Sequence, residues 1–203
     1  AIGKQYGIPT TIDIAADVPP VSNLWRFNEM GFDFVAISGG KALRGPQSAG
    51  LLMGKKDLIK AARLSMPPRG ETIGRGMKVN KEEILGMLVA VEEFVKIDHD
   101  AEALIFLERI KKIQAAADSV PGITTKISTP VLGNVTPNLN ISFDYSKIGK
   151  TGEQLRLDLR NGSPSIESVG GKDNIGMTAW SLQEGEDVIV AKRLKEVLEA
   201  AVK

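Results

Sequence analysis

The chain places one lysine, Lys41, directly after a Gly-Gly pair at the end of an apolar run, Phe34–Ile37. Such a run, bounded by glycines, predicts a short strand, and the glycines allow a ligand to approach the backbone closely. A lysine at this place can form a Schiff base with a carbonyl cofactor if desolvation or nearby charge disfavours its ammonium form. Ser-Gly-Gly-Lys alone more often marks a solvated loop lysine, so the interpretation depends on the residues around it.

The first 60 residues alternate short strand and helix signals at the spacing of α/β proteins. The predicted strands are 10–14, 34–38 and 49–53, and the predicted helices are 23–30 and 56–64. The first two strands are joined by a helix, which predicts a parallel pair. The third follows after a short turn-rich loop, which predicts an antiparallel pair. The Gly/Pro-rich connector 65–79 suits a domain boundary or an active-site loop.

We predict a second domain over residues 80–203, of the α+β class with an antiparallel sheet, after a first domain over 1–79. Asn80 and Glu83 have the spacing of a capping box at the start of a helix from Lys81. The residues predicted to be buried on this helix are Ile84, Leu85, Leu88, Val91 and Val95. Those on a helix over about 100–118 are Leu104, Ile105, Leu107, Ile110 and Ile113. Strands are predicted at 124–128, 139–143, 165–169 and 176–181, a helix near 151–160, and a terminal helix from about 186 with Val190, Leu194, Val197 and Leu198 inward.

The composition describes an ordinary globular protein, with 203 residues of which 42% are apolar and 25% charged. A net charge of +1 and the absence of a long apolar run predict binding neither to nucleic acid nor to a membrane. The absence of cysteine excludes thiolate chemistry and fits a reducing compartment, so we expect a cytoplasmic protein. With one histidine, His99, no metal site is expected, and Asp98-His99-Asp100 is interpreted as a helix junction.

Asp13 closes the first predicted strand, and the carboxyl ends of neighbouring parallel strands meet where open sheets bind ligands. A carboxylate there can pair with a protonated pyridine nitrogen while the lysine reaches the ring aldehyde, as pyridoxal phosphate requires. Ser38 could donate its hydroxyl to the cofactor phosphate, and the following glycine amides could form an anion-binding concavity. The nucleotide phosphate-loop pattern fails, because it needs glycine and a hydroxyl where the chain has Val35 and Ala42.

The run 38–59 resembles the lysine segment of the selenocysteine-synthase-like group of pyridoxal-phosphate enzymes. Within that group it is most similar to the D-glucosaminate-6-phosphate ammonia-lyase branch. Four further stretches agree with this resemblance: 11–20, 23–27, 73–84 and 179–187. The resemblance implies the α/β aspartate-aminotransferase-like fold (fold type I), with part of its large domain in residues 1–79 and its α+β small domain in 80–203. It also implies that Lys41 is the Schiff-base lysine, Asp13 the pyridinium partner and Ser38 a phosphate contact.

Three further residues are candidates for substrate binding: Arg44, Gln47 and Arg75. An arginine can grip a carboxylate or phosphate with two hydrogen bonds, although a structural ion pair is the alternative for both arginines. Arg75 could also reach the site of a neighbouring subunit, since fold type I sites commonly lie at a dimer interface. The family pattern tends to place a proline after this arginine, whereas the chain has Gly76.

Family members carry their other phosphate-binding loop and their ring-stacking residue upstream of the segment matched here. The chain begins without methionine, on a stretch that reads as the end of a helix entering a strand. We therefore expect that an N-terminal half is missing or is supplied by another polypeptide.

The resemblance implies a homo-oligomeric lyase that performs α,β-elimination and deamination of a polar or phosphorylated sugar amino acid. The products would be a 2-oxo acid and ammonia, with the freed Lys41 amine as general base at the α-carbon. One alternative is selenium or sulfur transfer to seryl-tRNA, against which the modest net charge counts. The other is a catalytically incomplete fragment with a structural role.

Overall fold

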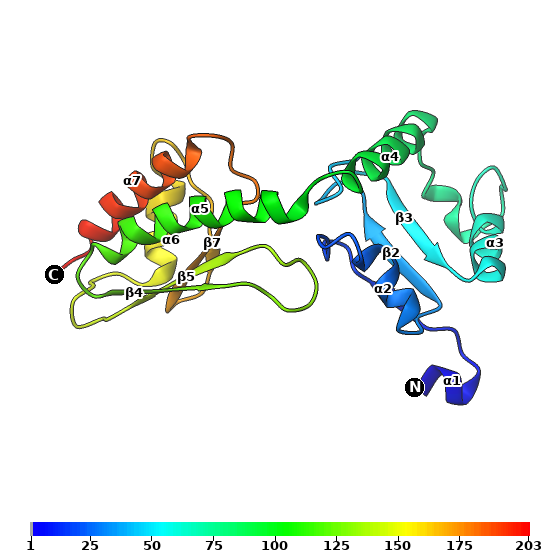
Figure 1. The fold of residues 1–203 in the computed structure, drawn as a ribbon, viewed down its shortest axis with the longest axis horizontal. Coiled ribbons are helices and arrows are strands. Elements are labelled where there is room, and N and C mark those ends of the chain that lie inside the picture. The colour runs from blue at the N-terminus through cyan, green and yellow to red at the C-terminus, as the bar shows by residue number, and fades with distance from the viewer. Residues whose placement is uncertain (1) are drawn as a thin grey trace. The chain divides into compact units, whose positions relative to one another are not determined.

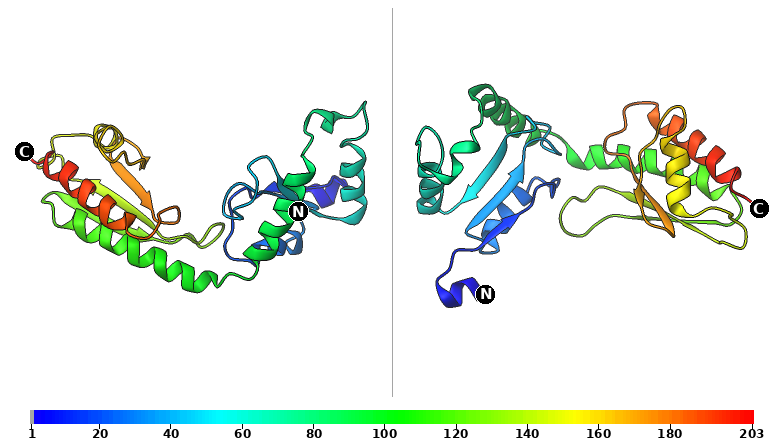
Figure 2. Two further views of the ribbon diagram at one scale, coloured as in Figure 1. Left: turned by 90° about the horizontal axis from the view of Figure 1, so that it is seen from above. Right: turned by 180° about the vertical axis from the view of Figure 1, so that it is seen from behind.

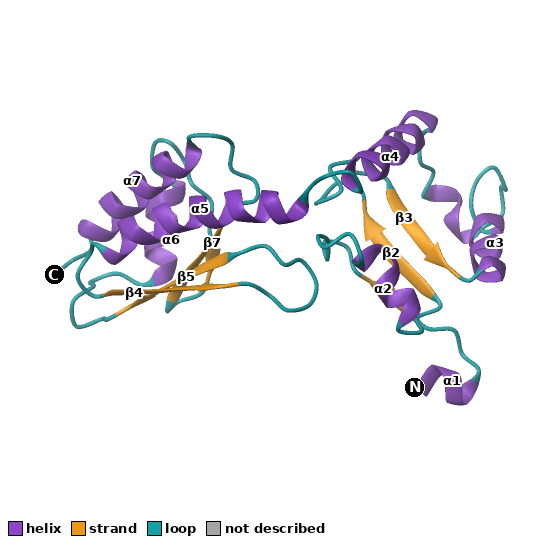
Figure 3. Cartoon of the chain, viewed as in Figure 1, coloured by secondary structure: helices purple, strands orange, loops and turns teal. Residues whose placement is uncertain are grey.

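The computed structural model describes residues 2–203, which form two compact units. The first unit contains the residues up to His99 together with Val131–Val135. The second contains Asp100–Pro130 and Thr136–Lys203. Figure 1 labels most of the elements of both units, and Figure 3 colours them by type.

The first unit is built on a three-stranded sheet in the order β1-β2-β3. β1 (Thr11–Asp13) pairs parallel with β2 (Phe34–Ser38), and β2 pairs antiparallel with β3 (Gly50–Gly54). Both predicted strand directions are therefore confirmed. The helices of this unit are α1 (Ile2–Tyr6), α2 (Asn23–Glu29), α3 (Lys56–Leu64), the 3-10 turn η1 (Ile73–Gly76) and α4 (Lys81–Phe94). The three strands and the helices beside them are visible from two further sides in Figure 2.

Helix α4 packs with the first unit, whereas the predicted domain boundary placed it in the second. Its buried side chains, Met87 and Phe94, join the core formed around Val35 and Ile37 of β2. The capping box is present at the start of α4, where the backbone amide of Asn80 donates to Glu83 Oε2 at 3.0 Å.

Of the five residues predicted to be buried on α4, Val91 is partly buried and packs against the core, and the other four are exposed. Ile84, Leu85, Leu88 and Val95 are between 45% and 64% exposed. The helix turns another face to the core because small residues there permit a closer approach than leucine and isoleucine would, as described below.

The second unit has a four-stranded antiparallel sheet in the order β4-β5-β7-β6. The strands are β4 (Ile123–Ser128), β5 (Asn138–Phe143), β6 (Val169–Gly170) and β7 (Asn174–Thr178), and the helices are α5 (His99–Asp118), α6 (Gly152–Arg160) and α7 (Glu186–Glu199). The antiparallel sheet was predicted. The strand expected over 165–169 is largely irregular, and the one expected over 176–181 begins and ends earlier.

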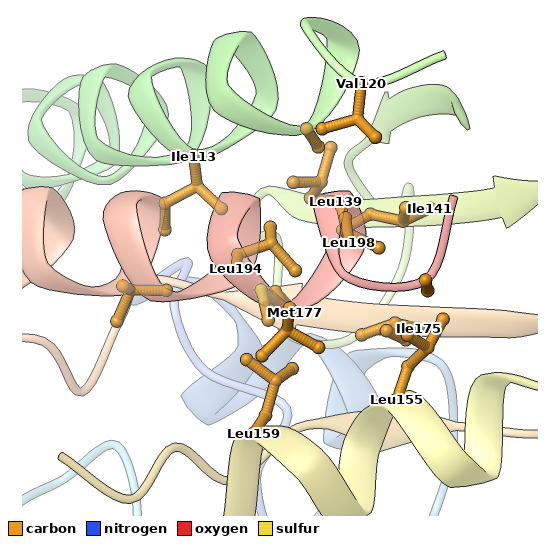
Figure 4. Packing of buried hydrophobic residues seen from close by; sticks show 14 of the residues in the cluster. Ile113, Val120, Leu139, Ile141, Leu155, Leu159, Ile175, Met177, Leu194 and Leu198 are labelled. Carbon is orange, nitrogen blue, oxygen red and sulfur yellow. The ribbon is translucent and has the colours of Figure 1, made fainter. Parts of the chain in front are cut away.

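The core of the second unit is formed where the helices meet one face of the sheet. Figure 4 shows Leu155 and Leu159 of α6 and Leu194 and Leu198 of α7 around Met177 of β7. All four residues predicted to point inward on the terminal helix are buried. This part of the fold is therefore confirmed at the level of single side chains.

Helix α5 buries Phe106, Ile110, Ile113 and Ala117, which recur every three or four residues. Leu104 and Ile105 fall off that stripe and are 64% and 52% exposed. Their predicted burial is wrong, whereas that of Ile110 and Ile113 is confirmed. The prediction left out Phe106 and Ala117, which complete the buried stripe.

Candidate functional site

The predicted site residues from β1 and β2 lie at one edge of the first unit's sheet. Asp13 is the last residue of β1 and is in register with Ala36, two residues before the end of β2 at Ser38. The backbone pairing continues past β1, because the Ile14 amide donates to Ala36 O at 2.9 Å and the Ser38 amide to Ala15 O at 3.3 Å. The parallel arrangement therefore brings the carboxyl ends of both strands together, as predicted.

Asp13 presents a partly fixed carboxylate to solvent. Its Oδ1 accepts a hydrogen bond from the Ala15 amide at 2.8 Å. Its Oδ2 has no hydrogen-bond partner among residues 2–203. A carboxylate oriented in this way keeps one oxygen available to accept a hydrogen bond from a ligand.

Lys41 lies in a loop, residues 39–49, that is held together by its own backbone. The Gly39 amide donates to Ala49 O at 2.9 Å, and the Gly45 amide donates to Gly39 O at 2.7 Å. Leu43, 2% exposed, fixes the loop in the core of the unit. Lys41 itself is exposed and forms no ion pair with any residue that the structure describes. The loop therefore supports a lysine whose amine is accessible.

Arg44 has a left-handed backbone, with φ of 57°, and no other non-glycine residue in the described part of the chain has a positive φ. Such a conformation costs roughly 1–3 kcal/mol and persists where the surrounding structure enforces it, often at functional sites. The Arg44 amide donates to the Lys41 carbonyl at 2.9 Å. The unusual conformation thus lies within the turn that carries the lysine.

Gln47 and Arg75, the other candidates, lie in different surroundings. Gln47 belongs to the Lys41 loop, where its Nε2 donates to Gly40 O at 3.2 Å. Arg75 lies in η1, and it lines an apolar groove of about 1080 Å³ together with residues of β3, α3 and α4. Asp13, Ser38 and the Lys41 loop therefore lie at one edge of the sheet, whereas Arg75 lines the groove. The substrate-binding roles stay predictions.

Two polar contacts near these elements were not predicted from the sequence. Ser48 Oγ donates to Glu83 Oε1, so the Lys41 loop is hydrogen-bonded to the first turn of α4. Asn23, 1% exposed, donates from Nδ2 to the carbonyls of Asp17 at 2.7 Å and Gly133 at 3.1 Å. The capping-box spacing identified Glu83 itself, but no sequence signal joined it to Ser48 or marked Asn23 as buried.

The Ser48 hydroxyl and, to a smaller extent, the Asn80 amide lower the pKa of Glu83 from its ordinary value. Glu83 is therefore an ionised acceptor at neutral pH. Residues 2–203 contain no group of three or more histidine, aspartate or glutamate side chains placed to hold a metal ion. No helix in the same range is long and apolar enough to cross a lipid bilayer.

His99 lies where α4 and α5 meet. Its Nε2 is 2.9 Å from the carbonyl of Phe94, and the two rings pack with centroids 4.4 Å apart. These contacts belong to the helix junction at which the sequence placed it.

Solved structures similar to this chain define its class. D-glucosaminate-6-phosphate ammonia-lyase matches with a TM-score of 0.73 at 23% identity, covering 98% of this chain and 52% of that protein. Serine palmitoyltransferase from S. paucimobilis, solved with a pyridoxal-phosphate–myriocin aldimine, matches with a TM-score of 0.60 at 10% identity, covering 98% and 48%. The chain thus has the aspartate-aminotransferase-like fold of pyridoxal-phosphate enzymes, fold type I, as predicted.

Curated relatives refine this class. A 5'-C-glycyluridine monooxygenase-decarboxylase from Streptomyces sp. is 32% identical over 202 residues, which are 98% of this chain and 48% of the relative. D-glucosaminate-6-phosphate ammonia lyase from Salmonella typhimurium is 25% identical over 205 residues, covering 98% and 52%. L-seryl-tRNA(Sec) selenium transferase from Aquifex aeolicus is 25% identical over 149 residues, covering 62% and 30%.

The chain is therefore homologous to the selenocysteine-synthase-like group of pyridoxal-phosphate-dependent enzymes, and the predicted resemblance is confirmed. Pyridoxal phosphate, the predicted cofactor, is the cofactor of these homologues and structural neighbours. No protein-family model matches the chain. The chain spans about half the length of the first two curated relatives.

Proposed function

We propose that this chain carries the lysine and aspartate of a pyridoxal-phosphate site that acts on the α-carbon of an amino substrate. The observation that supports the proposal best is the pairing of β1 with β2, which places Asp13 and the Lys41 loop after neighbouring parallel strands. The two side chains fit the cofactor chemically, because Oδ2 of Asp13 can accept from a protonated ring nitrogen and the accessible Lys41 amine can reach an aldehyde.

When bound, pyridoxal phosphate supplies an electron sink that weakens the bonds at the substrate α-carbon. Asp13 would keep a proton on the ring nitrogen, since a carboxylate beside a pyridinium stabilises its charged form. Lys41 Nζ would hold the cofactor through its aldehyde carbon. The Lys41 amine would also serve as the general base for the substrate α-proton, a role worth about 10²–10⁴-fold in rate. Ser38 would donate its hydroxyl to the cofactor phosphate.

Reduction with borohydride tests this assignment. The protein is incubated with pyridoxal phosphate, reduced, digested and analysed by mass spectrometry. We expect a pyridoxyl group on Lys41, and none at this position in Lys41→Ala. Lys60→Ala, which removes an exposed lysine of α3, is the matched control and keeps the adduct. An adduct spread over surface lysines, with Lys41 unmodified, would reject the proposal.

The reaction that we propose first is α,β-elimination and deamination of a polar or phosphorylated sugar amino acid, resembling the ammonia-lyase relative. Arg44, in the Lys41 loop, is proposed to contact the substrate carboxylate or phosphate, and Gln47 and Arg75 are weaker candidates for the same task. Release of ammonia and a 2-oxo acid from D-glucosaminate 6-phosphate tests this reaction. Arg44→Lys, which keeps the charge and removes the planar fork, should raise KM more than it lowers kcat.

A second reaction is favoured by the 32% identity with the monooxygenase-decarboxylase. It also starts at an α-carbon, but it consumes dioxygen and releases carbon dioxide. Oxygen uptake and carbon dioxide release with 5'-C-glycyluridine would favour this reaction, and ammonia release without oxygen uptake would favour the lyase.

We propose that the site is completed by polypeptide equivalent to the other half of the relatives, on the same chain or on another, in a homo-oligomer. The length of the relatives and the apolar groove beside Arg75 support this proposal. Light scattering of the intact protein measures its oligomeric state, and a monomer that binds the cofactor fully would contradict the oligomer.

A further inference from the structure

We propose that Glu83 is a positioning residue that holds the Lys41 loop on helix α4 through Ser48, so that the lysine is presented to the cofactor in a fixed place. This inference rests on the proposed function of Lys41. Neither Glu83 nor Ser48 belongs to the set of residues predicted to contact cofactor or substrate.

The two oxygens of the Glu83 carboxylate serve two different segments. Oε1 accepts from Ser48 Oγ, near the end of the Lys41 loop. Oε2 accepts from the Asn80 amide at 3.0 Å, which closes the capping box of α4. Hydrogen bonds to an ionised carboxylate are roughly twice as strong as those between neutral groups. One side chain therefore fixes both the loop and the start of the helix against which the loop lies.

The packing around this contact is close because small residues face each other. A Cβ added to Gly86 of α4 would lie 3.0 Å from Pro46 Cγ, and one added to Gly45 would lie 3.1 Å from Ala90 Cβ. A Cβ added to Gly39 would lie 2.5 Å from Met87 Sδ. A larger side chain at any of these glycines would therefore require its neighbours to shift.

Glu83, Gly86, Met87 and Ala90 share one face of α4, because residues three and four apart are neighbours on a helix. This face, and not the leucine-rich one, meets the Lys41 loop. Apolar contact fixes how closely the loop approaches the helix, but contact of this kind has no preferred direction. The Ser48–Glu83 hydrogen bond is directional, so it fixes where the loop lies along the helix.

The loop needs the Ser48–Glu83 hydrogen bond because it contains the left-handed Arg44 backbone. Without the Ser48 bond, residues 44–48 can relax toward less strained conformations, and the Arg44 amide bond to Lys41 O would move with them. A displacement of about 1 Å at a reacting group can cost as much as 10²-fold in rate. Loss of the bond should therefore affect the chemistry of Lys41 more than the stability of the fold.

Four variants of the intact protein separate positioning from helix capping. Ser48→Ala removes the loop bond and leaves the capping box intact. Glu83→Ala removes both, and Asn80→Ala removes a side-chain cap while keeping the backbone donor to Glu83. Ser48→Thr keeps the hydroxyl and is the conservative rescue. The readouts are the rate at which borohydride traps pyridoxyl-Lys41, the pH dependence of that rate, kcat, KM and thermal unfolding.

We expect Ser48→Ala and Glu83→Ala to slow trapping several-fold, to shift its pH profile and to lower kcat with little change in KM. Ser48→Thr should retain wild-type trapping. Asn80→Ala should lower the unfolding temperature and leave trapping unchanged. Wild-type trapping in Ser48→Ala, with Lys41 still the modified residue, overturns the positioning role and leaves the proposed function intact. Absence of trapping at Lys41 in the wild type rejects the proposed function itself.

Discussion

The two compact units differ in how completely their own side chains fill their cores. Of the twelve largest fully buried side chains among the described residues, ten lie in the second unit and only Ile14 and Val18 in the first. Both units expose some large apolar side chains, but 16 of the 25 exposed ones among the described residues lie in the first unit, including Ile73 at 94% and Leu85 at 64%. The unit that carries the candidate site is thus the one with the smaller core.

This difference indicates that the second unit owes its stability to its own core, whereas the first leaves an apolar groove open to further contacts. Burial of apolar surface is the main favourable term in folding, and the two units are of nearly equal length, about 100 residues each. We therefore expect truncations to act strongly in the second unit and weakly on the exposed face of the first.

The largest effect is expected from a matched pair of leucine truncations in helices. Leu194 of α7 is 0% exposed, whereas Leu85 of α4 is 64% exposed. Leu194→Ala leaves a cavity and should lower the free energy of unfolding by about 2–5 kcal/mol. Leu85→Ala should change it by no more than roughly 0.5 kcal/mol. Urea denaturation measures both.

Each unit contains one of the two tryptophans, so its unfolding can be followed separately. Trp25 lies in α2 of the first unit and Trp180 in the second. In a Trp25→Phe background, fluorescence reports the second unit, and in Trp180→Phe it reports the first. A cost above about 2 kcal/mol for Leu85→Ala in the first unit would contradict the comparison, since only a buried leucine loses that much.

A smaller loss of stability is expected when an ion pair of the second unit is removed. The carboxylate of this pair is buried, whereas its lysine is exposed. Lys112 Nζ lies 2.7 Å from Asp187 Oδ2, and the Asp187 side chain is only 3% exposed. The hydrogen bond from Lys112 holds the pKa of Asp187 below its usual value although burial raises it. Lys112→Ala leaves a buried carboxylate without its partner, which should cost about 1–3 kcal/mol.

The Lys112 side chain is 57% exposed, so the effect should fall toward the lower end of that range. Lys111→Ala is the matched control, because Lys111 pairs only with exposed Glu108 at 3.7 Å on the same helix. Equal unfolding midpoints for the two variants would show that the Asp187 pair adds nothing measurable.

The sequence predicted those parts of the fold that depend on local signals. Strands β1, β2 and β3 were predicted from short apolar runs, their directions from the connections between them, and the inward residues of α7 from the helical period. The buried face of α5 was predicted only in part, with Ile110 and Ile113 correct, and that of α4 was mostly wrong, since a count of large apolar residues gives no weight to Gly86, Ala90 or Ala117. Ala117 is buried in the second unit, and Gly86 and Ala90 let the Lys41 loop pack closely on α4.

In the candidate site, too, some residues could be predicted from the sequence and some contacts could not. Asp13, Ser38 and Lys41 could be placed at one sheet edge because strand order and strand ends are readable from the sequence. The contact between Ser48 and Glu83 joins polar residues 35 positions apart, and no periodicity marks such a pair. Asn23 was missed because its burial depends on a distant segment, around Gly133.

A still smaller effect should follow from removing one helix cap in each unit. Thr151 accepts from the Gln154 amide at 3.3 Å, and its own amide donates to Gln154 Oε1 at 2.9 Å. Thr151→Ala should cost about 1 kcal/mol in the second unit, and Asn80→Ala a similar amount in the first. Thr151→Ser retains the acceptor and should restore the loss. If Thr151→Ala lowered the stability reported by Trp25 instead, the two units would not unfold separately.

The smallest effect at neutral pH is expected at an ion pair on the rim of the first unit. The Asp33 carboxylate lies 2.6 Å from Lys55 Nζ and accepts from the Thr10 amide at 2.7 Å. The Lys55 hydrogen bond, followed by those from Thr10, lowers the pKa of Asp33 from 3.8 to about 2. Lys55 is 66% exposed, so solvent screens the pair and its contribution is modest.

A carboxyl group whose pKa is lower in the folded than in the unfolded protein stabilises the fold above the unfolded value and loses that contribution on acidification. The Asp33 contribution should therefore be complete above about pH 4 and vanish as the pH falls toward about 2. Urea midpoints in the Trp180→Phe background, read from Trp25, should show wild type and Asp33→Asn converging over this interval. Lys55→Met removes the largest cause of the shift and should move the transition of the remaining Asp33 upward in pH. A constant difference between wild type and Asp33→Asn from pH 5 to about pH 2 would mean that Asp33 acts through shape and not through charge.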